Sequence, residues 1–362
     1  MKNLIIFCPS DERGGVRKIL NNLLKILVKK KINIYLIINK FNKKNLNNNL
    51  KIINFKNKKI PFLNNRIISS YQASKMLINV IKKLNNNDTK ILSFQSNLFS
   101  VLIAKYFRTK IFVRVSEEPC NATKYADNLI FGVIIFFTKF ITYNLASLII
   151  VNAFKSKKCV DNLVLKRKTK LLYNPSISFK KIKIKKRKNY FLNVGRLCKQ
   201  KNQINLVKAF CLFNKKYTNF KLLIIGEGPD KNKLLKLINN LNLKKKVILM
   251  GWKNNPKDLY LKSKLFIIPS LYEGMPNSLI EAINFNIPSI GSSASGIEDL
   301  LLNGKGGFIL KKNNVESIYK SMTYSIQNYK IMLKKSNLAK SKLDRFHIKT
   351  AAEKYYNFIL KY

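Results

Sequence analysis

Short apolar runs alternate with helical patterns from the first residues of the chain onward. The run NLIIFC at residues 3–8 is followed by a loop with two glycines. Apolar residues then recur on one face of a helix, at Val16, Ile19, Leu20, Leu23, Leu24 and Leu27. Further strand candidates, separated by helical patterns, are INIYLIIN, KILSFQS, KIFVRVS and SLIIVN. This alternation predicts a parallel α/β sheet.

The same pattern starts again in the second half of the chain, after an irregular basic stretch. Strand candidates there are YFLNVG, KLLIIG, KVILMG, KLFIIPS and IPSIGSS. We therefore predict two Rossmann-like domains, at residues 1–175 and 190–344, joined by a basic linker at 176–189. Residues 345–362 form a terminal helix with apolar residues at Phe346, Ala351, Tyr355 and Phe358, and this helix is a candidate to cross back to the first domain.

Residues 128–151, NLIFGVIIFFTKFITYNLASLIIV, are nearly long enough to span a bilayer. Polar residues from Lys139 to Asn144 interrupt the apolar run, and SLIIVN provides a strand that the sheet requires. We therefore expect a helix followed by a buried strand. The helix is apolar on nearly every face, so it either inserts shallowly into an anionic membrane surface or is buried between domains.

Charge is the most unusual feature of the composition. Lys plus Arg number 70 against 17 for Asp plus Glu, a formal net charge of +53. Such a charge attracts nucleic acid, anionic lipid or phosphorylated substrates. The chain is also rich in Asn and Ile, which share A/T-rich codons with Lys, so a genome bias explains the charge equally well. A nucleic-acid-binding protein would need aromatic residues interleaved with cations, or a recognisable module, and the sequence has neither.

The five cysteines are scattered, without a C-x-x-C pair, and there is one histidine. We therefore expect neither a disulfide framework nor a zinc site, as in a protein of the reducing cytoplasm. The N-terminal apolar run is too short for a signal peptide and is expected to be a buried strand.

Three glycine-bearing loops follow predicted strands, at Gly14 and Gly15, at Gly195, and at Gly226 and Gly228. Ligands of open parallel sheets bind at this edge, and bare backbone amides at helix N-termini hold phosphate. Glycine in such a loop can equally be only a backbone requirement. In VGRLCKQKN the cations Arg196 and Lys201 lie at the same edge, where both could reach one diphosphate or could simply be solvated.

Two glutamates in PSLYEGMPNSLIEA, residues 269–282, stand out in a chain poor in acid. Glu273 precedes a predicted helix, at the end of a strand, where a carboxylate can accept hydrogen bonds from sugar hydroxyls. Ser278 and Glu281 match the S-x-x-E capping box, so Glu281 either caps the helix or binds ligand. Carboxylates on both sides of a phosphate-binding helix start suit a nucleotide sugar.

Five segments taken together resemble the successive motifs of the retaining GT-B glycosyltransferases of the glycosyl transferases group 1 family. They are GGVRKILNNLL, NVGRLCKQKN, IIGEGPDKNKL, VILMGWKNNP and PSLYEGMPNSLIEA, in the family's order. The resemblance covers residues 1 to about 310. It implies two Rossmann-like α/β domains facing a central cleft, with the acceptor on the first and the donor on the second.

The resemblance also implies a role for each matching residue. Gly15 would approach the donor phosphates, Arg196 and Lys201 would neutralise the diphosphate, and Glu273 would bind the transferred sugar. Glu281 would bind the ribose. Backbone amides of the helix start would cradle phosphate, and a turn would hold the base; these positions are Asn277, Ser278, Leu279 and Trp252, Lys253, Asn254.

The sequence departs from the family pattern in the first domain. Many members have a histidine there, near the donor sugar, whereas the only histidine here is His347. Arg114, Ser116 and Glu117 are the candidates to replace it, unless they form an ordinary polar loop. Asp299 in GIEDLL is the candidate to replace a family glutamate in the second domain.

No Asp-x-Asp pair occurs in the sequence. We therefore predict no metal and no cofactor, with a helix N-terminus and cations stabilising the leaving diphosphate instead.

These observations predict a metal-independent, retaining glycosyltransferase that uses a nucleotide sugar. The expected donor is a UDP-sugar such as a UDP-N-acetylhexosamine, with GDP-mannose as the alternative. The expected acceptor is a lipid-linked or surface polysaccharide, at the cytoplasmic face of the plasma membrane. A nucleic-acid-binding protein and an inactive scaffold of the same fold are the rival interpretations.

Overall fold

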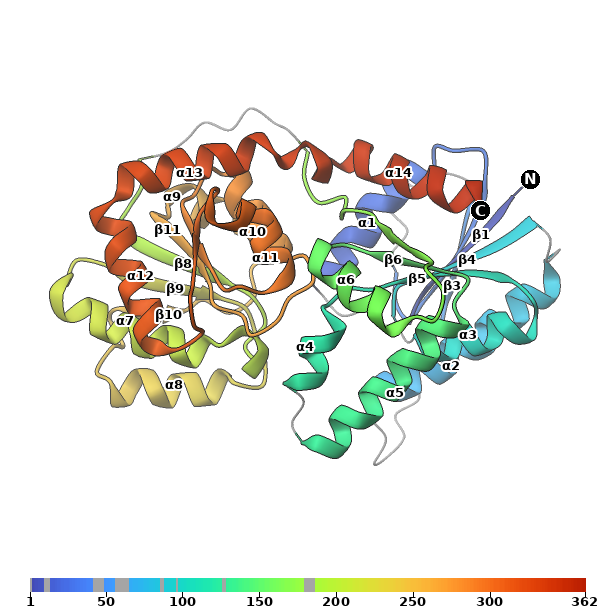
Figure 1. Ribbon diagram of the computed structural model, residues 1–362, viewed down its shortest axis with the longest axis horizontal. Helices are drawn as coiled ribbons and strands as arrows, with labels where there is room; N and C mark the ends of the chain where they lie inside the picture. The colour runs from blue at the N-terminus through green and yellow to red at the C-terminus, as the bar shows by residue number, and fades with distance from the viewer. Residues whose placement is uncertain are drawn as a thin grey trace. The chain divides into compact units, whose positions relative to one another are not determined.

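The structure is a computed structural model that describes residues 2–9, 14–41, 49–55, 65–84, 88–95, 97–125, 128–178 and 186–362. The chain forms two compact units, each built around its own parallel sheet (Figure 1). The first unit contains Met1–Ser176 and Ile348–Tyr362, and the second contains Ile177–His347. The α/β fold class predicted from the alternation of strands and helices is confirmed in both units.

The sheet of the first unit has its strands in the order β3-β2-β1-β4-β5-β6-β7, and neighbouring strands are parallel. The strands are β1 (Asn3–Cys8), β2 (Asn33–Ile38), β3 (Leu50–Asn54), β4 (Thr89–Ser93), β5 (Lys110–Arg114), β6 (Leu148–Val151) and β7 (Thr169–Leu171). The sequence did not predict β3 and β7, which lie at the two edges. Edge strands are half-covered, so they lack the continuous apolar runs of the central strands.

Helices cover both faces of this sheet because successive side chains of a strand point to opposite faces. Leu4 and Ile6 of β1 pack in one core with α1 and α14, which contact each other, and Ile5 and Phe7 pack in another with α2 and α3 (Figure 1). The helices are α1 (Gly15–Leu27), α2 (Asn65–Lys83), α3 (Asn97–Tyr106), α4 (Pro119–Lys124), α5 (Leu129–Leu145), α6 (Phe154–Leu163) and α14 (Ile348–Lys361).

The C-terminal helix belongs to the first unit, although the residues before it belong to the second. Its buried residues Ala351, Tyr355 and Phe358 lie in the core shared with α1. Phe346 lies before the helix, in the 3-10 turn η4 (Leu343–Phe346). Lys90 of β4 donates to the carbonyl of Ile359 at 2.9 Å, so the sheet also holds the end of the helix.

The second unit repeats the architecture with the strand order β10-β9-β8-β11-β12-β13. Its strands are β8 (Tyr190–Val194), β9 (Lys221–Ile225), β10 (Val247–Leu249), β11 (Leu265–Ile268), β12 (Ser289–Gly291) and β13 (Phe308–Ile309). Its helices and turns are η2 (Lys199–Lys201), α7 (Gln203–Lys216), α8 (Lys231–Asn240), α9 (Lys257–Lys262), α10 (Asn277–Asn284), α11 (Ser295–Leu300), η3 (Leu302–Gly304), α12 (Val315–Gln327) and α13 (Tyr329–Ser341). The strand order reverses between the parallel neighbours β8 and β11, because β9 and β10 follow on one side of β8 and β11 to β13 on the other. Open α/β sheets bind ligands at such a switch point.

The expected linker at residues 176–189 is described only at its ends, because 179–185 lie outside the described residues. Ile177 forms a bridge with His347. The guanidinium of Arg187 donates to the carbonyls of Ser263 at 2.7 Å and Asn286 at 2.6 Å. Residues on both sides of the undescribed stretch therefore pack on the second unit.

We expected no disulfide framework, as in the reducing cytoplasm, and the structure contradicts that expectation at one pair of cysteines. Cys120 at the start of α4 and Cys159 of α6 form a disulfide with their Cα atoms 6.2 Å apart. The two helices pack together, although the cysteines are 39 residues apart in the sequence. Spacing alone carries no signal for such a pair.

Candidate active site

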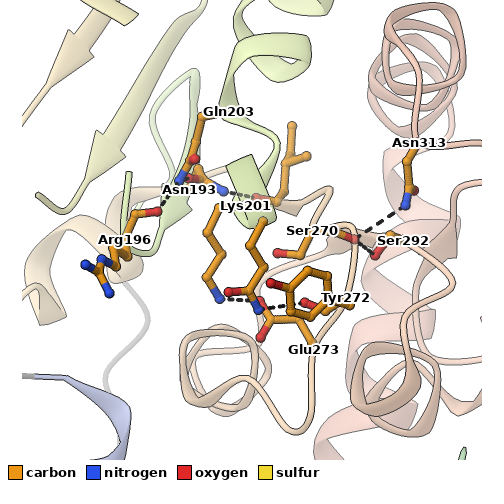
Figure 2. Close-up of polar contacts among 11 residues, drawn as sticks. Asn193, Arg196, Lys201, Gln203, Ser270, Tyr272, Glu273, Ser292 and Asn313 are labelled. Atoms are coloured by element: carbon orange, nitrogen blue, oxygen red, sulfur yellow. Dashed lines mark hydrogen bonds and ion pairs between the residues drawn. The ribbon is translucent and has the colours of Figure 1, made fainter. Parts of the chain in front are cut away.

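The switch point of the second sheet brings two predicted residues into direct contact. Lys201 ends the loop that follows β8, and Glu273 lies in the loop that follows the neighbouring strand β11. The Nζ of Lys201 forms an ion pair with the Oε1 of Glu273, across 72 residues of sequence (Figure 2). Glu273 is buried, and the Lys201 side chain is one-fifth exposed. The pair is therefore a charged site held at the ligand-binding edge.

Hydrogen bonds join these two loops along their length. The amide of Leu271 donates to the carbonyl of Gln200 at 2.8 Å, and Nε2 of Gln200 donates to the carbonyl of Tyr272 at 2.9 Å. Asn202 adopts the left-handed conformation, with φ of 55°, and donates to the carbonyl of Pro269 at 3.2 Å. These contacts fix the backbone on both sides of the ion pair, so its geometry is preorganised.

Arg196 lies at the same edge but is held through its backbone. Nε2 of the buried Gln203 donates to the Arg196 carbonyl at 3.0 Å, while Gln203 also approaches Asn193 (Figure 2). The Arg196 side chain is exposed, and its guanidinium makes no hydrogen bond or ion pair with any described residue. An anion reaching this edge could therefore bind Arg196 without first breaking a protein contact.

Two glycines allow the site loops to approach other backbone closely. A Cβ at Gly226, which has φ of 147°, would lie 1.9 Å from the carbonyl oxygen of Gly195. A Cβ at Gly296, in α11, would lie 1.7 Å from the carbonyl oxygen of Gly274, next to Glu273. Both separations are far inside van der Waals contact. Glycine at these positions thus supports the two loops that carry Lys201 and Glu273.

Of the two alternatives for Ser278 and Glu281, the capping box does not form at the start of α10. The N-cap is Pro276, and no side chain caps the helix. Ser278 is therefore the second helical residue and Glu281 the fifth, and the N-cap proline has no amide hydrogen to donate to Glu281. The amide of Leu279 donates to the Pro276 carbonyl at 3.2 Å. Phosphate binding by the amides of Asn277, Ser278 and Leu279 stays a prediction.

Glu281 instead lies near a buried tyrosine. The hydroxyl of Tyr260 of α9 donates to the carbonyl of Ser278 at 3.3 Å. Burial, followed by the charge of Glu281, raises the pKa of Tyr260 well above its ordinary value. The Tyr260 hydroxyl therefore supports the first turn of α10 through the Ser278 backbone.

The predicted base-binding turn follows β10 and is exposed. Trp252, Lys253 and Asn254 are all exposed, and the indole nitrogen of Trp252 donates to Oδ1 of Asn254 at 3.0 Å. The Gly226 amide donates to the Gly251 carbonyl at 3.0 Å, which joins this turn to the loop after β9. The turn thus lies at the same sheet edge as the other predicted donor residues.

Residues predicted in the first unit are placed as follows. Gly15 begins α1. Arg114 is 1% exposed and donates to Ser116 at 2.6 Å and to Oδ1 of Asn174 at 2.7 Å, which suits a support of the loop after β5 better than a direct sugar contact. Glu117 pairs with Lys139 of α5 at 3.5 Å. Roles for Ser116 and Glu117 at a sugar stay predictions.

The sequence did not reveal the residues whose side chains support the site loops through hydrogen bonds. They are Asn193, Gln200, Asn202, Gln203 and Tyr260. Each is buried or half-buried, and their side chains act on backbone or on another side chain. Gln200, Asn202 and Gln203 could have been recognised from their position next to Lys201 in the sequence. Polar residues in a loop beside a buried sheet edge need hydrogen-bond partners.

Among the described residues, no group of three or more His, Cys, Asp or Glu side chains could hold a metal ion. Asp299 lies in α11, and its backbone carbonyl accepts a hydrogen bond from Arg345 at 2.9 Å. The suggested role for the Asp299 side chain stays a prediction.

Residues 176–342 match the family model described as Glycosyl transferases group 1. An uncharacterized glycosyltransferase of Methanocaldococcus jannaschii is 36% identical over 210 residues, which are 53% of this chain and 51% of that protein. The chain thus spans about half the length of that relative.

A second relative comes from Campylobacter jejuni and is named N-acetylgalactosamine-N,N'-diacetylbacillosaminyl-diphospho-undecaprenol 4-alpha-N-acetylgalactosaminyltransferase. It is 29% identical over 279 residues, 73% of this chain and 75% of the relative. Among solved structures, Anabaena HepE in complex with UDP and glucose has a TM-score of 0.77 at 16% identity, with 100% of both chains covered. The chain therefore has the GT-B fold, and its residues 176–342 are similar to the glycosyl transferases group 1 family.

Proposed function

We propose that the chain is a retaining glycosyltransferase that transfers a sugar from a nucleotide sugar to a lipid-linked or surface polysaccharide acceptor. The observation that carries the proposal is the Lys201–Glu273 pair at the switch point of the second sheet. A nucleotide sugar has a diphosphate that attracts the ammonium group and hydroxyls that hydrogen-bond to the carboxylate. One ligand therefore satisfies both members of the pair.

The chemistry follows from where charge develops. Transfer breaks the bond between the sugar C1 and the diphosphate oxygen, so negative charge grows on the departing diphosphate. Lys201 and the exposed Arg196 can neutralise that charge, assisted by the amides at the start of α10. Glu273 would orient the sugar, and Glu281 would hold the ribose. We propose that these groups act without a metal ion or cofactor.

A UDP-sugar is the donor we propose, with GDP-mannose as the alternative. The structural neighbour from Anabaena holds UDP and glucose, and the Campylobacter relative is named for transfer of N-acetylgalactosamine. A UDP-N-acetylhexosamine combines these two features. The base would lie against the turn at Trp252–Asn254, whose exposed indole offers a surface for stacking.

A thermal-shift screen of nucleotide sugars tests this proposal. UDP-sugars at about 100 times their Kd should raise the melting temperature by roughly 5–10 °C, because ligand binding stabilises the folded state by mass action. GDP-mannose at equal concentration should leave it unchanged. A shift from GDP-mannose alone would select the alternative donor. Stabilisation by RNA or DNA, with none from either class of sugar nucleotide, would overturn the proposal in favour of a nucleic-acid-binding protein.

The acceptor proposal includes a peripheral position at the cytoplasmic face of the plasma membrane. The Campylobacter relative is named for a diphospho-undecaprenol acceptor, which is a lipid. In this chain α5 is followed by the buried strand β6, as the sequence predicted. No helix of the described residues is both long and apolar enough to cross a bilayer.

The outer face of α5 is nevertheless strongly apolar. Ile130 is 75% exposed, Phe137 57% and Ile134 54%. Thr138 turns its hydroxyl back onto the Ile134 carbonyl at 2.7 Å, and Lys139 points to Glu117 and Pro119, so neither offers this face a free polar group. An apolar face on a chain of charge +53 suits a surface of anionic lipid.

Liposome flotation tests the membrane position. Binding should require anionic lipid and weaken at high salt, because each nearby cation contributes about 1 kcal/mol before screening. A variant with Ile134, Phe136 and Phe137 replaced by serine should bind at least 10-fold less, since burial of each large side chain contributes roughly 1.5–3 kcal/mol. Serine at the exposed Ile331 and Leu338 of α13 is the control. Equal recovery with neutral and anionic vesicles would reject the electrostatic model.

A further inference from the structure

We propose that the Cys120–Cys159 disulfide is a redox-sensitive switch, which orders the loop after β5 when it is oxidised and releases that loop when it is reduced. This inference rests on the proposed function, because it places the protein at the cytoplasmic face and gives the loop a part in sugar transfer. Disulfides of the cytosol are usually transient and redox-sensing rather than structural. A disulfide in that compartment therefore suits a switch better than a permanent crosslink.

The disulfide links two helices that follow neighbouring strands of the first sheet (Figure 1). α4 begins at Pro119, after β5, and α6 begins at Phe154, after the adjacent strand β6. Cys120 is the second residue of α4, so the bond lies directly behind residues 115–118, which we call the β5 loop. Ligands of parallel sheets bind at the carboxyl ends of strands. The disulfide thus lies at the edge where the first unit would meet a sugar.

The other contacts that hold the β5 loop and the start of α4 are non-covalent. The ammonium group of Lys139 lies 3.5 Å from the Glu117 carboxylate and donates to the Pro119 carbonyl at 3.3 Å. Nδ2 of Asn121 donates to the Glu118 carboxylate at 2.9 Å. Because the Glu117 side chain is 48% exposed, its ion pair contributes little to the order of the loop. Lys139 lies on α5 and Asn121 on α4 itself, so the disulfide is the covalent attachment of this segment to α6.

α4 is too short to be stable by itself. It has six residues, Pro119–Lys124, whereas isolated helices shorter than about 12–15 residues are marginal in water. Its order therefore depends on attachment to its neighbours, and cleavage of the disulfide removes the covalent attachment. We expect the reduced protein to keep both sheets and to lose order locally, in the β5 loop and α4.

A dithiol reductant can break the bond by thiol–disulfide exchange. Cys120 is exposed whereas Cys159 is buried, so the thiolate of the reductant attacks the Sγ of Cys120. The S–S bond of the protein breaks, and Cys159 leaves as a thiolate that takes up a proton. The second thiol of the reductant then displaces Cys120 from the mixed disulfide. The reductant loses two electrons and becomes a disulfide, and the protein gains two thiols.

The test compares the oxidised and the reduced form of the full chain, prepared in oxidised and in reduced dithiothreitol and identified by intact mass after alkylation. Reduction should speed hydrogen exchange of residues 115–124 about 10-fold or more. Release of UDP from the donor should slow about 5-fold or more, because Ser116 and Glu117, the predicted sugar contacts, lose their fixed geometry. Reoxidation should restore both. The Kd of UDP should change by less than about 2-fold, since the proposed nucleotide contacts lie on the second unit. GDP and GDP-mannose replace these probes if the thermal-shift screen selects them.

Cys120→Ser and Cys159→Ala should behave like the reduced form in either buffer. The matched control is Cys211→Ala, which removes a half-buried free cysteine of α7 in the second unit and should respond to redox state like the wild type.

Equal exchange and equal UDP release in the two forms would overturn the inference while the proposed function stands, and so would a redox response that persists in Cys120→Ser. Loss of UDP binding on reduction would indicate general unfolding and would likewise reject a local switch. Failure of the wild type to bind any nucleoside diphosphate in either form would instead overturn the proposed function.

Discussion

Lys201→Ala is expected to lower turnover about 100-fold, the size of effect that follows loss of one preorganised group at a developing negative charge. The substitution removes the cation nearest the proposed diphosphate and leaves the buried Glu273 without its partner. A buried carboxylate without a cation also lowers stability. Release of nucleoside diphosphate from the donor, measured beside the melting temperature, separates the two effects.

Lys199→Ala is the matched control, because Lys199 lies in the same 3-10 turn and is exposed. It should keep normal turnover. Arg196→Ala should lose activity like Lys201→Ala but keep its stability, since the guanidinium is exposed and makes no hydrogen bond or ion pair with described residues. Normal rates in both Arg196→Ala and Lys201→Ala would remove the assignment of the diphosphate to this edge.

Glu273→Gln and Glu281→Gln should differ in kind. Glu273→Gln is expected to lower kcat by about 100-fold, because a neutral amide neither pairs with Lys201 nor accepts strong hydrogen bonds from the sugar. Its melting temperature should fall by less than about 4 °C, equivalent to roughly 1 kcal/mol. Glu281→Gln should act mainly on donor KM, since it lies at the ribose rather than at the reacting carbon.

Steady-state kinetics at saturating donor distinguish these two roles. If Glu281→Gln had the lower kcat under that condition, the order of roles that we assign to the two glutamates would be reversed. Equal melting temperatures would make the comparison independent of folding.

The central strands and their flanking helices could be predicted from the sequence because their physical signal is local. Strands buried on both faces require continuous apolar runs such as NLIIFC, and amphipathic helices require a repeating apolar face. The edge strands β3 and β7 and the short β13 are specified by neighbours distant in sequence, so local pattern does not reveal them.

The site also has residues with a local sequence signal and contacts that depend on the order of the strands. Arg196, Lys201 and Glu273 were predictable because each follows a strand, and parallel strands place their carboxyl ends at one edge. That Lys201 and Glu273 pair directly depends on β8 lying beside β11, which only the strand order shows.

Other contacts depend on tertiary packing. The hydrogen bond from Tyr260 of α9 to the Ser278 carbonyl of α10 joins two separate helices, and the Cys120–Cys159 disulfide requires α4 to lie against α6. The capping-box pattern at Ser278 was misleading because the helix already begins at Asn277, after the extended N-cap Pro276. A short motif shows which local contact is possible, and tertiary packing determines whether that contact forms.

A crystal structure of the protein with bound UDP, grown in the presence of a chelator, tests the central claim most directly. We expect the diphosphate within hydrogen-bond distance of Lys201 and Arg196, roughly 2.7–3.2 Å, with the ribose hydroxyls on Glu281 and the base against Trp252–Asn254. A diphosphate bound away from the carboxyl ends of β8 and β11, with Lys201 and Glu273 still paired and untouched, would contradict the account.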